Sequence, residues 1–184
     1  MLTCPYCQHR VQEDSPHCPS CSLSVKNAAS ILGPIPLLNP GLTDIVEILS
    51  KKQTKQIRSS ISTFQSAFPY SQLSIVLHTF DPKFNLSTQL FWLFNSAGLS
   101  TEENQLEKNQ DVLIGLDPAS NRLGLIIGYG LEPYISQNSL SALLELARPD
   151  LEEGSPTKAL QLVIKKLAAL LNNSSQAAKE ALGI

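Results

Sequence analysis

Two Cys-x-x-Cys pairs stand within the first 21 residues of this 184-residue chain, and no cysteine follows them. The four are Cys4, Cys7, Cys18 and Cys21, in the stretch CPYCQHRVQEDSPHCPSC. Thiolates from two tight turns can converge on one zinc ion, which accepts four sulfurs tetrahedrally. Because such a site leaves no open coordination position, we expect a structural zinc ribbon over residues 1–24 and no catalysis there.

Two alternatives for this stretch are less favoured. A redox dithiol is the first, but the chain has two matching pairs and no strand-helix-strand pattern around either. Ligation by His9 or His17 is the second. With four cysteines available, we expect both histidines to be ordinary surface residues.

Charge and hydropathy restrict the partners and the compartment. The formal net charge is −2, and Arg10 and Lys26 are the only basic residues up to position 26. Phosphate binding needs several basic contacts, so nucleic acid is not an expected partner, and a protein partner is favoured. We find neither a secretory signal pattern nor an apolar run of about 20 residues that would anchor the chain in a membrane. The expected location is the cytoplasm, where cysteines stay reduced.

Residues 25–41 predict a linker before the main domain. The stretch VKNAASILGPIPLLNPG contains three prolines and two glycines and has no clean period. Its apolar residues predict that part of it packs on the main domain, which we place at 42–171. Residues 172–184 predict a weakly helical or disordered tail.

Helical spacing and capping signals predict four helices in the main domain. The first follows Ser50-Lys51-Lys52-Gln53, a capping-box pattern, and ends at Pro69. The second covers 85–99, with Gly98 placed to stop it. The third starts near Ser139 and is closed by Arg148-Pro149, and the last begins at Ser155-Pro156.

Apolar runs predict the strands of a mixed sheet. Residues 73–80 (LSIVLHTF) form a buried strand, in which we expect His78 to be a tolerated strand residue. Residues 111–116 and 123–127 flank the turn-forming DPASNR and predict an antiparallel hairpin. Strands separated by helices indicate an α/β fold, a three-layer αβα sandwich.

The stretch GYGLEP after the hairpin raises the question of a phosphate-binding loop. The dinucleotide fingerprint needs a third glycine where this chain has Pro133, and no Gly-Lys-Ser/Thr is present. We therefore interpret Gly128 and Gly130 as structural glycines, which relieve crowding or permit positive φ where the strand leaves the sheet.

The order of these segments resembles the TPM-domain family, phosphatase-like proteins that include thylakoid-lumen proteins of photosystem repair. The resemblance rests on the hairpin followed by Gly128, Gly130, Leu131 and Glu132, which match the family's Gly-x-Gly-Leu-Glu. Asp44 and Pro149 also stand in the corresponding order. Together these segments cover roughly residues 42–171.

The resemblance implies an αβα sandwich with an acidic pocket, in a family with weak acid phosphatases, divalent-ion binders and assembly factors. Asp44 and Glu132 match acidic positions of the family. The chain departs from the pattern at Gln110-Asp111, where the family usually has Asn-Gly, and at Ser136-Gln137, where it often has Thr-Asp. Family members commonly carry a signal peptide and a membrane anchor, and we expect neither here.

We therefore expect a non-catalytic interaction or assembly module made of a zinc ribbon and a TPM-like domain. The alternative is a weak divalent-metal-dependent phosphatase with an acidic pocket. Its carboxylates would come from Asp44, Asp111 and Glu132, a set that would hold calcium or magnesium weakly. Asp117 could support them, although it also fits the first position of an Asp-Pro turn. No nucleophile with an adjacent base is recognisable.

Overall fold

The computed structural model describes residues 2–182, apart from positions 5, 6, 8, 13, 14, 25, 34, 40 and 97–109. The main domain is built on a four-stranded sheet of strand order β3-β4-β5-β6. The strands are β3 (Leu42–Asp44), β4 (Leu73–Leu77), β5 (Val112–Asp117) and β6 (Arg122–Ile127). The first three run parallel and β6 is antiparallel to β5, which confirms the mixed sheet and the hairpin.

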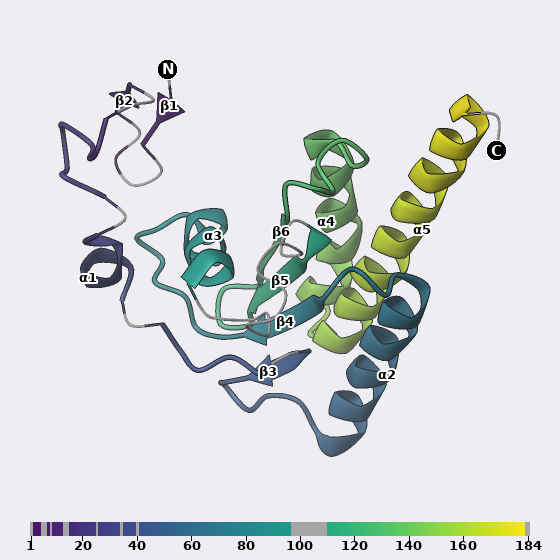
Figure 1. Cartoon of the computed structure of the whole chain (residues 1–184). Coiled ribbons are helices and arrows are strands. Elements are labelled where there is room, and N and C mark those ends of the chain that lie inside the picture. The colour runs from purple at the N-terminus through teal and green to yellow at the C-terminus, as the bar shows by residue number, and fades with distance from the viewer. Residues whose placement is uncertain are drawn as a thin grey trace.

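Helices cover both faces of this sheet and give three layers (Figure 1). One face carries α2 (Lys51–Ala67), α4 (Gln137–Glu152) and α5 (Pro156–Leu182), and the other carries α3 (Leu86–Ser96). Every residue of β4 and β5 is buried, because both strands are sandwiched between these layers. The three-layer α/β architecture predicted from the sequence is confirmed.

The described residues up to position 32 contain a short hairpin and a short helix. Strands β1 (Leu2–Thr3) and β2 (Arg10–Val11) pair as a hairpin, and the short helix α1 (Ala28–Leu32) follows. The segment between α1 and β3 contributes Leu38 to the core beneath α3, whereas Leu37 is 89% exposed. One apolar residue of this segment therefore docks on the main domain.

Local capping chemistry explains where α2 and α5 begin. Ser50 accepts a hydrogen bond from the Gln53 backbone N–H, and the Gln53 side chain accepts one from the Ser50 N–H. These bonds complete the predicted capping box. Pro156 opens α5 after Ser155, also as predicted, because proline lacks the N–H that the first turn of a helix cannot pair.

Three predicted boundaries need correction. Strand β4 ends at Leu77, so His78 follows the strand instead of belonging to it. The neighbouring strand β3 ends at the same level, because its last residue, Asp44, lies opposite Leu77. Helix α3 begins one residue later than predicted, and Gly98, its expected stop, lies outside the described residues.

The third correction concerns Pro149, which lies inside α4 instead of closing it. Proline removes one N–H from the helix ladder, yet the helix continues to Glu152. It ends where Gly154 takes φ 70° and donates its N–H to the Leu151 carbonyl at 2.9 Å. A glycine in the left-handed region is the usual way to end a helix.

A cross-strand pair of glycines brings α3 close to the sheet. Gly115 of β5 lies opposite Gly124 of β6, on the face that α3 covers. A Cβ built on Gly115 would lie 2.1 Å from Leu90 Cδ2, and one on Gly124 would lie 2.5 Å from Leu90 Cδ1. The fully buried Leu90 side chain therefore occupies the space that two side chains would otherwise fill.

Candidate functional site

The four cysteines come together as the sequence predicts. Their sulfur atoms all lie within 4.8 Å of one another, with Cys4 Sγ 3.7 Å from Cys21 Sγ and Cys7 Sγ 3.6 Å from Cys18 Sγ. A zinc ion with Zn–S bonds of ~2.3 Å separates its four sulfurs by about 3.8 Å. All four cysteines are free thiols, so the cluster has the donor set and spacing of a metal site.

Backbone hydrogen bonds shape the two turns that present these thiols. The Cys4 N–H donates to the His9 carbonyl at 2.8 Å, and the Cys18 N–H donates to the Leu23 carbonyl at 2.8 Å. A hydrogen bond from the His9 backbone lowers the pKa of Cys7 to about 6, whereas burial raises the pKa of Cys21 to about 12. Metal binding requires deprotonated thiols, so it would release protons from this cluster. His9 and His17 are exposed and do not belong to the cluster.

The carboxylates proposed for a divalent site occupy opposite ends of the sheet. Asp44 ends β3 and lies level with Leu77, which lies level with Leu116 near the end of β5. Asp111 precedes the start of β5, five residues before Leu116, which is about 16 Å along a strand at ~3.3 Å per residue. Glu132 is exposed in the turn after β6, at the same end as Asp111. Asp44 is therefore separated from the other two.

Backbone amides already occupy two of these carboxylates. Asp44 Oδ2 accepts the Leu49 N–H at 2.9 Å, although its buried Oδ1 has no partner. Asp111 Oδ1 accepts the Gln72 N–H at 3.0 Å, across to the turn before β4. Within the described ranges, the cysteines are the group of three or more potential ligands close enough to share a metal ion.

Asp117 belongs to an ion-paired network that the sequence reasoning did not anticipate. It is 1% exposed, and its Oδ2 accepts hydrogen bonds from Arg122 Nη2 at 2.8 Å and Ser120 Oγ at 2.6 Å. Its Oδ1 accepts the Ala119 N–H at 3.2 Å, which fits the predicted Asp-Pro turn. Burial alone would raise the pKa of Asp117, but the hydrogen bonds from Ser120 and Arg122 and the charge of Arg122 hold it below its ordinary value.

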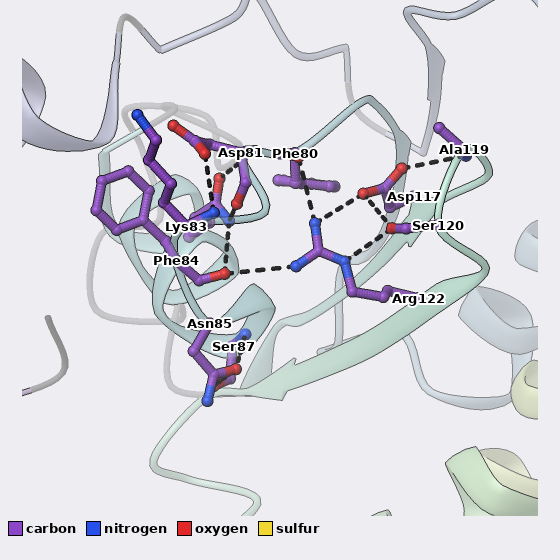
Figure 2. Close-up of polar contacts among 11 residues, drawn as sticks. Phe80, Asp81, Lys83, Phe84, Asn85, Ser87, Asp117, Ala119, Ser120 and Arg122 are labelled. Carbon is purple, nitrogen blue, oxygen red and sulfur yellow. Dashed lines mark hydrogen bonds and ion pairs between the residues drawn. The ribbon is translucent and has the colours of Figure 1, made fainter.

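Arg122 also ties the hairpin to the loop that leads into α3. Its guanidinium donates to the Phe80 carbonyl at 3.2 Å and to the Phe84 carbonyl at 3.4 Å (Figure 2). One side chain thus joins a hairpin carboxylate to two carbonyls some 40 positions away in sequence. Strand register could have indicated the pair, because Asp117 and Arg122 close the hairpin opposite each other.

His78 lies near this network with a polar atom unpaired. Its Nδ1 is buried and has no hydrogen-bond partner, and its ring lies edge-on to Phe80 at a centroid distance of 5.2 Å. Burial lowers the pKa of His78, and the charge of Asp117 raises it by a smaller amount. The fold therefore favours the neutral imidazole.

We expect the unfolding free energy of the main domain to fall as the pH drops below about 6.5, the ordinary pKa of histidine. Because the folded pKa is lowered, His78 contributes its full stability above that pH, and the contribution is lost as the pH falls through the folded pKa. Urea unfolding followed through Trp92 fluorescence measures this, and His78→Gln should flatten the dependence between pH 7.5 and pH 5. Equal slopes in the two proteins would contradict it.

Gly128-Tyr129-Gly130 directly follows the end of β6, where the chain turns out of the sheet. The Gly128 N–H donates to the Asp111 carbonyl at 2.8 Å and extends the hairpin by one pair. A positive φ is recorded at Gly33, Gly41 and Gly154. The structural role of Gly128 and Gly130, by relief of crowding or by positive φ, stays a prediction. Gly128 is buried, whereas Tyr129 is 66% exposed.

The fold and the cysteine cluster together define an α/β sandwich domain that is preceded by four cysteines able to hold a metal ion. Comparison with family models finds the TPM domain over residues 42–170. The chain belongs to the TPM domain family. A search of curated proteins finds no match.

Three solved structures share the fold. The N-terminal domain of a P. gingivalis protein has 22% identity and a TM-score of 0.61, covering 72% of this chain and 82% of its own. The BA42 protein of Bizionia argentinensis has 14% identity and a TM-score of 0.57, covering 71% and 86%. The N-terminal domain of cg2496 protein from Corynebacterium glutamicum has 12% identity and a TM-score of 0.55, covering 88% and 86%. At these identities the likeness concerns the fold alone.

The helices were also compared with the requirements of a bilayer. Among the described residues, none of the helices combines the length and the apolar character needed to cross a membrane.

Proposed function

We propose that this protein is a non-catalytic interaction or assembly module of the cytoplasm, in which a zinc-bound ribbon and a TPM domain each present a binding surface to protein partners. The observation that carries this is the placement of the acidic residues. Asp44 lies at one end of the sheet, and Asp111 and Glu132 lie at the other. A divalent-ion site for phosphate chemistry needs several carboxylates around one position.

The hydrogen bonding of the carboxylates supports the same proposal. Asp44 and Asp111 each accept a backbone N–H, and Asp117 is paired with Arg122. These bonds hold loops in place and leave the carboxylates less available to a metal ion. Zinc is the proposed ion of the ribbon because four thiolates at tetrahedral spacing match its preferred donor set.

A phosphatase assay tests this proposal. With p-nitrophenyl phosphate and calcium, magnesium or manganese, we expect no turnover above the protein-free rate, because no described pair of groups supplies both a metal site and a nucleophile. Glu132→Gln and the matched surface variant Glu153→Gln should behave like the wild type. Robust metal-dependent turnover that Glu132→Gln abolishes and Glu153→Gln preserves would instead establish the enzyme.

A further inference from the structure

The exposed face of α2 carries a block of positive charge. Lys51, Lys52, Lys55 and Arg58 stand at the start of the helix, and all four are exposed. No aspartate or glutamate occurs over residues 48–80 to balance them. Among the described residues, none of the four cations has a carboxylate within ion-pair distance. The first half of α2 therefore presents four unneutralised charges to its surroundings.

This charge distribution does not stabilise the helix. The N-terminus of a helix carries the positive end of its dipole and favours acidic residues, yet the first turn of α2 has none and contains Lys51 and Lys52. Lys51 and Lys55 are four positions apart, and Lys55 and Arg58 are three apart, so like charges lie side by side on one face and repel each other. Since folding gains nothing from this arrangement, it indicates a surface for an anionic molecule.

The buried side of α2 argues against a bilayer as that molecule. A helix that lies on a membrane inserts its apolar face, but Ile57, Ile61 and Phe64 of α2 are buried in the core of the domain. Because α2 carries four positive charges and the whole chain carries −2, the rest of the chain carries −6. A negatively charged bilayer would attract α2 alone and repel this remainder.

The composition of α2 also argues against nucleic acid. A protein that binds a duplex commonly makes about 6–10 phosphate contacts, and α2 offers four cations. Single strands are held by exposed aromatic rings on which bases stack, whereas the one aromatic residue of α2, Phe64, is buried. A short acidic segment of a protein needs neither feature.

We propose that the basic face of α2, formed by Lys51, Lys52, Lys55 and Arg58, binds an acidic segment of a partner protein. From Lys51 to Arg58 the face extends about 10 Å along the helix axis, at ~1.5 Å per residue, which spaces its cations for successive carboxylates of one segment. Ile48, which is 41% exposed and precedes the helix, adds an apolar contact at the end of this face. The inference rests on the proposed interaction function, because it names the chemistry of one partner of the TPM domain.

A fluorescein-labelled peptide of ten glutamates is the probe, titrated with the zinc-loaded full chain and followed by fluorescence anisotropy. Lys51→Glu/Lys55→Glu should weaken binding about tenfold or more, because it places like charges against the peptide. Lys165→Glu/Lys166→Glu makes the same change of charge at two exposed positions of α5 and should weaken binding less than about twofold. Glutamate in the first turn suits the helix dipole, so the α2 variant should be at least as stable as the wild type.

Two results overturn the proposal. One is that the wild type does not bind the glutamate peptide in low salt, or that the α2 and α5 variants lose binding equally, which would reflect net charge alone. The other is tighter binding, at this same face, of phosphatidylserine-containing vesicles or of a DNA duplex than of the peptide. The phosphatase assay remains a separate test: turnover would refute the proposed function, whereas failure to bind the peptide would refute only the acidic partner of this face.

Discussion

Gly115→Ala should lower the unfolding free energy of the main domain by about 3 kcal/mol, the upper end of the usual range for overpacking a core. The added Cβ would lie 2.1 Å from Leu90 Cδ2 and 2.8 Å from Leu90 Cδ1. Leu90 is fully buried between α3 and the sheet, so it can retreat only by moving α3 or by leaving its rotamer. Urea unfolding, followed through Trp92 in the same helix, measures the change.

A double variant shows whether the clash is the cause. Leu90→Ala alone should cost about 2–5 kcal/mol, because it leaves a cavity. In Gly115→Ala/Leu90→Ala the new methyl group enters that cavity, so the combined loss should be smaller than the sum of the two single losses. Additive losses would mean that the glycine is needed for its backbone conformation, and not because Leu90 occupies the space beside it.

Cys18→Ser should abolish stoichiometric metal binding while the TPM domain stays folded. Metal analysis of the wild type should give close to one zinc per chain, because the four sulfurs lie within 4.8 Å of one another. Folding of a small ribbon depends on the metal, whose binding free energy is about 10–16 kcal/mol in comparable peptides. Removing one of four thiolates therefore removes most of the ribbon's stability.

His17→Gln is the matched control for this variant. His17 precedes Cys18 and is exposed outside the cluster, so its replacement should leave the zinc content unchanged. The urea transition of the main domain should be the same in all three proteins, since that domain has its own core. Absence of zinc from the wild type, or disulfides between the cysteines, would refute the ribbon.

The parts of the fold predicted correctly were those encoded by neighbouring residues. The capping box at Ser50, the turn at Asp117 and the Cys-x-x-Cys pairs each lie within a few positions, and the structure contains all three. The end of α4 was misjudged because two local signals compete there. Proline weakens a helix but does not always end it, and the left-handed conformation of Gly154 does.

The features that the sequence did not predict depend on distances between segments. Asp44 and Glu132 were grouped by family resemblance, with Asp111 as a further carboxylate. Only the register of β3, β4 and β5 shows that Asp44 and Asp111 lie at opposite ends of the sheet. Arg122 reaches carbonyls 42 and 38 positions earlier in the chain, which no local pattern reports. The role of Gly115 and Gly124 likewise requires knowing which face α3 covers and how close it lies.

The helical layers on the two faces of the sheet differ in thickness. This difference decides which layer separates from the sheet at the lower free energy. Three helices and a large apolar cluster lie on one face, while α3 and a cluster of seven buried residues lie on the other. Regions with fewer buried apolar contacts open at lower free energy than the whole molecule. The α3 layer is therefore the part that can detach in a sub-global fluctuation while the other two layers remain assembled. The Arg122 bonds to the Phe80 and Phe84 carbonyls join this layer to the hairpin, so losing them should let the buried glycine pair meet solvent more often.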